Sequence, residues 1–270
     1  MSRALQCSTR LIDDLDFRID AMCGPFGGVH AYCTDSSILP LVEYKGWLEI
    51  PSWDWLGGYR LACTGDDWKR IRDHVKQELS IRECAERYDG MVREDDDHAV
   101  ITLSLVGYRE QFEHGKHRRQ AWREATRVPA GWTWNMGFDH ALYDWMCDEA
   151  AVRFGDASYL QDERNRQSLA WMLQAAAKRG ALVSVSASLS ERLVAAAYYL
   201  LDRPGRYVGY VVGRTLTEYK GFGRSLYIKG VELAELHRCI TMTSYAGVSD
   251  MKRSMLCESV PMFKYERVAQ

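Results

Sequence analysis

The sequence predicts a mixed α+β fold, and three observations carry that prediction. In the first third of the chain, short runs of β-branched and aromatic residues alternate with turns, as the strands of a sheet do. In the second half, two helical segments precede three consecutive strand-like segments. The composition, 47% hydrophobic and 27% charged over 270 residues, is that of a globular protein with a substantial core.

The first part of the chain combines strands with an aromatic loop. Residues 1 to about 26 are punctuated by glycine and proline, and we expect them to cover a surface. Strands are expected at 29–33, 39–44, 47–50 and 59–63. Between the last two, a glycine-terminated loop carries Trp53, Asp54 and Trp55 shortly before Tyr59. These residues either cap a core or line a binding site for a cationic or planar acceptor.

A strongly basic helix follows. The sequence predicts a helix at about 66–77, a strand at 99–106 and a second helix at about 108–127, which is the most charged segment of the chain. Four cations of this second helix recur at spacings of three and four residues and therefore share one face: Lys116, Arg119, Arg123 and Arg127. Such a face either is solvated or contacts phosphates, those of a coenzyme A nucleotide or of a nucleic-acid backbone.

A domain boundary is expected at Val128-Pro129-Ala130-Gly131, where the order of elements changes. We therefore expect two domains, residues 1–128 and residues 129–270. In the second domain, helices are expected at 138–154 and 164–179, followed by strands at 181–189, 192–201 and 207–213. A helix that ends at residue 237, a strand at 240–244, a short helix at 251–257 and a final strand at 262–268 complete it.

The turn after the strand at 207–213 is the centre of the functional argument. Gly221 and Gly223 let this turn fold tightly and leave the amides of the first helical turn facing its interior. The positive end of the helix dipole adds to those amides, so we expect a pyrophosphate as the ligand. The glycine spacing fits neither the P-loop nor the dinucleotide-binding fingerprint. By itself it also fits a plain turn that joins a strand to a helix.

This turn resembles the Arg/Gln-x-x-Gly-x-Gly/Ala loop with which GNAT-type N-acyltransferases hold the pyrophosphate of an acyl-coenzyme A. Lys220 stands at the basic position, Gly223 at the central glycine and Ser225 at the small final residue. Lys220 and Ser225 both depart from the usual pattern, which leaves the identity of the donor open. The whole loop, which the resemblance assigns to donor binding, comprises Lys220, Gly221, Phe222, Gly223, Arg224 and Ser225.

The resemblance extends over about residues 29–268. The second half has the order of elements of a GNAT acyltransferase, and the whole chain resembles the two-lobed Fem-type transferases, in which an incomplete N-terminal copy of that fold precedes a complete C-terminal one. Fem-type enzymes take aminoacyl groups from tRNA, whereas many related two-lobed proteins use acyl-coenzyme A. We prefer acyl-coenzyme A here, because the residues that most resemble a family site are those that would grip its pyrophosphate.

The resemblance implies an N-acyltransferase, most simply an acetyltransferase that moves the acetyl group of acetyl-CoA to a primary amine by direct attack, without a metal. In such enzymes the backbone of the preceding strand lines the pantetheine arm, which maps to Tyr210, Val211, Val212 and Gly213. The general acid is often a tyrosine after the following strand. Tyr245 occupies that place, and Asp250 and Lys252 follow it. Tyr245 could instead pack at a strand end and Asp250 could cap a helix.

The rest of the composition narrows the class of protein. A formal net charge of −2 argues against a general polyanion binder, although a local basic patch remains compatible with nucleic acid. No apolar run reaches the length of a membrane span and no signal segment is seen, so we expect a cytoplasmic protein. The eight cysteines lack the spacing of a zinc site. A non-catalytic ligand-binding module and an enzyme acting on a nucleic-acid base remain alternatives. The oligomeric state stays open.

Overall fold

The computed structural model describes residues 11, 14–22, 29–33, 38–44, 47–49, 61, 63–76, 78–95, 100–128, 131–246 and 249–267. These residues form a mixed α+β structure that contains two sheets. Contacts divide the chain into two compact units. The first unit comprises Met1–Val100, Tyr245–Gly247 and Ser259–Gln270, and the second comprises Ile101–Ser244 and Val248–Glu258.

The first unit is built on a six-stranded sheet with the order β1-β2-β3-β4-β13-β5. Its strands are β1 (Val29–Cys33), β2 (Ile38–Tyr44), β3 (Trp47–Glu49), β4 (Glu78–Cys84), β5 (Val92–Arg93) and β13 (Phe263–Arg267). Its helices are α1 (Leu15–Met22) and α2 (Gly65–His74). Thr64 caps α2 by accepting a hydrogen bond from the amide of Asp67 at 3.2 Å. Trp68 of α2 is fully buried against the edge of the Tyr265 ring, which fixes the helix to the last strand.

The second unit is built on a seven-stranded sheet with the order β12-β6-β11-β10-β9-β8-β7. Its strands are β6 (Val100–Ser104), β7 (Gly131–Met136), β8 (Leu182–Leu189), β9 (Arg192–Asp202), β10 (Tyr207–Thr215), β11 (Thr241–Ala246) and β12 (Glu258–Val260). Its α-helices are α3 (Lys116–Thr126), α4 (His140–Phe154), α5 (Glu163–Lys178), α6 (Phe222–Leu236) and α7 (Asp250–Ser254). Short 3-10 turns occupy η4 (Glu110–Phe112), η5 (Gly155–Ala157) and η6 (Tyr159–Gln161).

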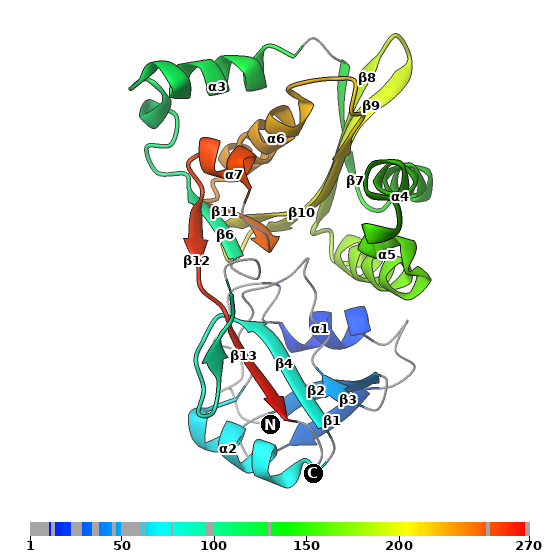
Figure 1. Ribbon diagram of the computed structural model, residues 1–270, viewed down its shortest axis with the longest axis vertical. Helices are drawn as coiled ribbons and strands as arrows, with labels where there is room; N and C mark the ends of the chain where they lie inside the picture. Colours follow the sequence, from blue (N-terminus) through cyan, green and yellow to red (C-terminus); the bar gives the residue numbers. More distant parts are fainter. Residues whose placement is uncertain are drawn as a thin grey trace. The chain divides into compact units, whose positions relative to one another are not determined.

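Helices cover both faces of this second sheet. Figure 1 shows α6 against one face and α4 with α5 against the other. Successive side chains of a strand point to opposite faces of its sheet, and two consecutive tyrosines of β9 show this. The Tyr198 hydroxyl donates to the carbonyl of Asp139, next to α4, at 2.7 Å, whereas the Tyr199 hydroxyl donates to the carbonyl of Leu226 in α6 at 2.5 Å. The sheet is therefore the buried middle layer of the unit.

Most expected elements are present, but the division into domains differs from the expected one. The boundary at 128/129 falls inside the second unit, because α3 packs on α6 and β6 joins the second sheet. The final strand was expected in the second domain, and that expectation is wrong: β13 pairs with β4 and β5 of the first sheet. Helix α1 and strands β4, β5, β7 and β12 were not predicted. Among the described residues, no helix is both long and apolar enough to cross a lipid bilayer.

Candidate functional site

Strands β10 and β11 part in the middle of the second sheet. Their parallel pairing runs from Tyr207 opposite Thr241 to Gly209 opposite Thr243, although β10 continues to Thr215 and β11 to Ala246. A bulge at Val211, where the register with β9 shifts, bends β10 at this point. Beyond Gly209, the edge of β10 that faces β11 has no paired strand within the described part of the chain. An extended ligand that carries amide groups can pair with such an edge.

Tyr210 is the first residue of β10 beyond the paired segment. Its ring meets the edge of Tyr199 at 5.4 Å between centroids and lies 5.2 Å from the ring of Tyr227 in α6. A Cβ atom at position 213 would lie 1.8 Å from the Tyr210 hydroxyl, so only glycine leaves room for this ring. Burial raises the pKa of Tyr210 to about 12, which keeps the phenol neutral. Val211 and Val212 are buried, so the predicted donor contacts of this segment are restricted to its backbone.

The predicted anion cradle lies at the start of α6. Gly221 caps this helix with a φ of 92°, a left-handed conformation that favours glycine, and no side chain caps the first-turn amides. A Cβ atom at Gly223 would meet no other atom within 4 Å, so its backbone borders open space. Lys220 is exposed beside it, whereas Phe222 is buried 6.1 Å from the ring of Trp132. The cradle therefore offers backbone amides and one lysine to an anion.

The last two residues of the predicted loop turn their side chains toward α3. The Ser225 hydroxyl is buried and donates to the carbonyl of Ala125 at 2.6 Å. The guanidinium of Arg224 forms an ion pair with Glu124 of α3. These contacts attach α6 to α3, so the side chains of Arg224 and Ser225 are used for packing, and only their backbone amides remain to serve a donor.

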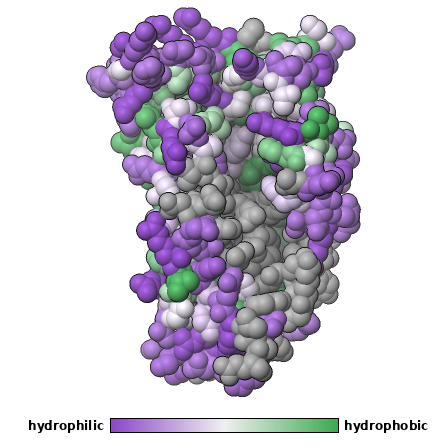
Figure 2. Space-filling model, in the orientation of Figure 1, coloured by the Kyte–Doolittle hydropathy of each residue, from purple (hydrophilic) through white to green (hydrophobic). Residues whose placement is uncertain are grey.

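The four predicted cations of α3 lie on an exposed face of this helix. Lys116, Arg119, Arg123 and Arg127 are all exposed, while Ala121 and Ala125 are buried on the other side of the helix. Figure 2 shows a continuous hydrophilic surface in this region. The C-terminal end of α3 contacts the start of α6 through Glu124 and Ala125, whereas the cations lie on the opposite face of α3.

The three predicted catalytic residues have different environments. The backbone of Tyr245 belongs to β11, but its side chain lies outside the described residues. Asp250 is the first residue of α7 and is exposed. It does not take the alternative role of a helix cap, because Ser249 caps α7 by accepting from the amide of Lys252 at 3.2 Å. Lys252 is half-buried and donates its ammonium proton to the carbonyl of Ser244 at 3.1 Å. Burial lowers the pKa of Lys252 to about 8.

Three further polar residues surround Lys252 and were missed in the sequence. Tyr227 of α6, Ser244 of β11 and Cys257, which follows α7, lie together with it. We call Tyr227, Ser244, Lys252 and Cys257 the polar cluster. Their positions in the sequence give no common spacing, so no local signal identifies them as a group.

The predicted acceptor wall cannot be placed. Trp53, Asp54, Trp55 and Tyr59 all lie outside the described residues. They stay candidates on the strength of their sequence alone. Within the described part of the chain, no three His, Cys, Asp or Glu side chains are grouped so that they could hold a metal ion.

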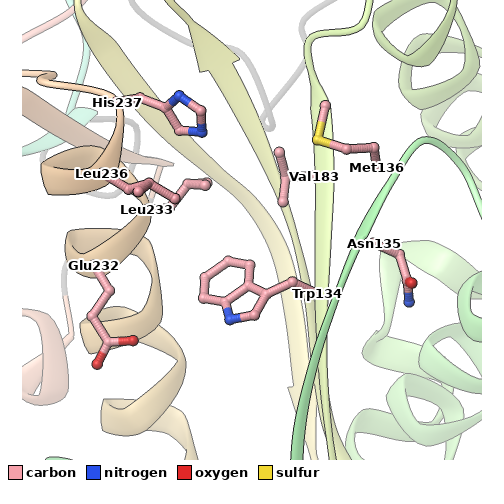
Figure 3. A pocket seen from close by; sticks show the side chains of 8 residues that line it. All are labelled: Trp134, Asn135, Met136, Val183, Glu232, Leu233, Leu236 and His237. Carbon is pink, nitrogen blue, oxygen red and sulfur yellow. The ribbon is translucent and has the colours of Figure 1, made fainter.

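A separate pocket of about 490 Å³ lies between the second half of α6 and strands β7 and β8. Figure 3 shows Trp134 and Leu233 facing each other across it, with Glu232 and His237 at opposite ends along α6. Its walls are mostly apolar and include no lysine or arginine: Trp134, Asn135, Met136, Val183, Glu232, Leu233, Leu236 and His237. The pocket thus lacks the cations that suit a pyrophosphate and is distinct from the cradle at the start of α6.

Comparisons with known proteins place the fold. No family model matches the chain, and no curated protein matches its sequence. Among solved structures, a conserved protein of unknown function from Bacteroides thetaiotaomicron VPI-5482 is similar, with a TM-score of 0.63 and 12% identity over 95% of this chain and 92% of that chain. FemX gives a TM-score of 0.62 with 10% identity over 99% and 97%. L-PGS from Bacillus licheniformis gives 0.59 with 11% identity over 94% and 92%.

These likenesses cover nearly the whole of each chain, although the sequences have diverged almost completely. The fold of this chain is therefore similar to that of FemX and of L-PGS.

Proposed function

We propose that this chain is an N-acyltransferase that moves an acyl group, most simply the acetyl group of acetyl-CoA, to a primary amine by direct attack. One observation carries the proposal: the unpaired edge of β10 leads into the open, glycine-bounded start of α6. A pantetheine arm has amides that can pair with the backbone from Tyr210 to Gly213. A pyrophosphate then suits the amides of the first turn of α6 and the side chain of Lys220.

The chemistry of this transfer needs few groups. A neutral amine must reach the thioester, its carbonyl must be polarised, and the departing thiolate must gain a proton. Backbone amides of the unpaired β10 edge suit the carbonyl oxygen. Tyr245, Asp250 and Lys252 are the candidates for handling protons and for orienting the amine. Trp53, Asp54, Trp55 and Tyr59 remain the proposed acceptor wall.

A second donor, an aminoacyl-tRNA, is favoured by one specific observation. The helix that carries the exposed cationic face, α3, is attached to α6 by contacts of Ser225 and Arg224 with its C-terminal end. A nucleic acid whose acylated end enters the cleft would find its backbone phosphates matched by this face. The Fem-type resemblance points the same way, since those enzymes take aminoacyl groups from tRNA. The same face also suits the nucleotide end of coenzyme A.

We further propose that the first unit is an incomplete copy of the fold of the second. Its sheet is mixed, with β3 and β4 parallel and the other pairs of known register antiparallel. This arrangement would give the chain two related lobes, as the Fem-type resemblance implies.

Binding measurements separate these donors. Calorimetry is done with coenzyme A and with total tRNA, each at low and at high salt. If acyl-CoA is the donor, coenzyme A should bind with an affinity that depends moderately on salt. Tight tRNA binding with a steep salt dependence, together with no coenzyme A binding, would indicate that the donor is an aminoacyl-tRNA and not acyl-CoA. Coenzyme A binding without turnover of any amine in a broad panel would indicate a non-catalytic module. If neither ligand binds, the proposed cradle is wrong.

A further inference from the structure

The polar cluster lies at the point where β11 leaves β10. Ser244 directly follows Thr243, the last residue of β11 that pairs with β10. The ammonium of Lys252 donates to the Ser244 carbonyl at 3.1 Å. The hydroxyl of Tyr227 interacts with the side chains of both Ser244 and Cys257, and Cys257 interacts electrostatically with Lys252. The end of β11, α6 and the segment around α7 thus each contribute to one group.

Two hydroxyls of this cluster are buried without a regular hydrogen bond. Tyr227 is 1% exposed and Ser244 is 7% exposed. Within the described part of the chain, neither hydroxyl meets the geometry of a full hydrogen bond, although they are near enough to affect each other. A buried hydroxyl left in this state lowers the stability of the fold, a cost that a phenylalanine or an alanine at the same position would not incur. Such a cost within a transferase fold calls for a functional explanation.

The cluster is continuous with the unpaired edge of β10. The ring of Tyr227 lies 5.2 Å from the ring of Tyr210, the first residue of that edge. A donor arm laid along β10 from Tyr210 to Gly213 would therefore end near the polar cluster rather than near the apolar pocket at the other half of α6.

We infer that Lys252 is the proton shuttle of the acyl transfer, held in place by the Ser244 carbonyl and set near Cys257, while Tyr227 interacts with both Ser244 and Cys257. This inference rests on the proposed function and deepens it. The bound amine attacks the thioester carbon, so a carbon–nitrogen bond forms and the carbon–sulfur bond breaks. The Lys252 ammonium gives its proton to the departing sulfur. The neutral Lys252 amine then takes the excess proton from the attacking nitrogen, which leaves an amide, a free thiol and the original ammonium.

The acidity of the cluster fits this role. A buried ammonium with a pKa of about 8 gives its proton to an alkyl thiolate, whose acid has a pKa of about 8.5, at almost no cost in free energy. Burial raises the pKa of Cys257 to about 11 and that of Tyr227 well above its usual value, so both stay neutral at pH 7. They therefore add no charge that would fix the proton of the lysine.

The first test asks where the thioester lies, without any turnover. Bromoacetyl-coenzyme A places an electrophilic carbon at the position of the acyl group, and displacement of its bromide by a nearby nucleophile forms a stable bond. Peptide mass spectrometry should find the label on Cys257 or Lys252, and free coenzyme A should prevent it. Labelling confined to other residues, in a sample that binds coenzyme A, overturns the inference. Failure to bind coenzyme A at all counts instead against the proposed donor.

The second test concerns the proton. Thiol release from acetyl-CoA is followed with hydroxylamine as the probe amine. Lys252→Arg keeps a cation but cannot release its proton, so kcat should fall roughly 10²- to 10³-fold while coenzyme A affinity holds. The wild-type kcat should also decline as the pH rises through about 8, and Lys252→Arg should lose that decline. Lys229→Met, which removes a lysine of α6 paired with Glu232, is the matched control. Full activity with an unchanged pH profile in Lys252→Arg refutes the shuttle.

Discussion

Gly223→Asp is the substitution that separates the donor cradle from a plain turn. The position lies in the first turn of α6, and a side chain there meets no protein atom within 4 Å. Folding should therefore tolerate aspartate. Replacing a glycine inside a helix stabilises the folded state by about 0.5–1 kcal/mol, and a carboxylate near a helix N-terminus stabilises it by roughly 0.3–1 kcal/mol. The free energy of unfolding should stay equal or rise slightly.

Donor binding should respond in the opposite way. A carboxylate about 4 Å from a phosphate charge repels it by about 1 kcal/mol in water and by about 4 kcal/mol at the effective dielectric constant of a protein surface. Because about 1.4 kcal/mol corresponds to a factor of ten, coenzyme A should bind roughly 5- to 1,000-fold more weakly. Calorimetry measures the affinity and urea unfolding the stability.

The chain offers a matched control for this experiment. Gly65 is the first residue of α2, and a side chain there also meets no atom within 4 Å. Gly65→Asp should resemble Gly223→Asp in stability and leave coenzyme A binding unchanged. If Gly223→Asp binds coenzyme A as tightly as the parent, the start of α6 is a simple turn and the reasoning from its open backbone is refuted.

Three further predictions follow from the same contacts. Ser225→Ala should lower the free energy of unfolding, measured in urea, by about 1–3 kcal/mol, because the Ala125 carbonyl loses its buried hydrogen-bond donor. The affinity for coenzyme A should stay unchanged. Weaker binding with unchanged stability would instead indicate that the Ser225 side chain contacts the donor. Three exposed cations of α3 should be replaced by glutamine together: Lys116, Arg119 and Arg123. The slope of log affinity for tRNA against log salt concentration should then fall in magnitude by roughly 2–3. An unchanged slope would show that these cations only face solvent. The pKa of Lys252 is lower in the folded than in the unfolded state, so the free energy of unfolding of the wild type should increase as the pH rises from about 8 to 10.5. Lys252→Met should lack this increase, which is on the order of 3 kcal/mol. An equal increase in both proteins would contradict the lowered pKa of Lys252.

Local patterns made the second unit largely predictable. Its helices and the three strands from residue 182 to 215 follow from periodic apolar residues and from turns that end each run. The candidate cradle could be proposed from the sequence for the same reason, since its glycines stand between a strand and a helix that are both evident. Strand β7 was missed because Gly131–Met136 is short and mostly exposed, so it lacks the alternation of a half-buried strand.

Features that depend on distant contacts were not predictable. Nothing in residues 263–267 indicates that they pair with residues 79–84 rather than with their own neighbours. Tyr227 reads as one more apolar residue of a helix, and only the fold brings its hydroxyl to Ser244 and Cys257. The sequence assigned Arg224 and Ser225 to donor binding, whereas in the structure their side chains pack against α3. Their partners, Glu124 and Ala125, lie about 100 residues away in the sequence, so this packing could not be predicted from local sequence.

The place of β13 between β4 and β5 has a consequence for how the protein matures. Domains usually fold in the order in which the ribosome makes them, the N-terminal one first. Here β4 and β5 emerge long before the strand that joins them, so the first sheet stays open while the second unit is being synthesised. The second sheet, whose strands all lie between residues 100 and 260, is complete earlier. The first sheet is thus the later of the two to be completed, and a nascent chain exposes the edges of β4 and β5 until residues 263–267 have been made.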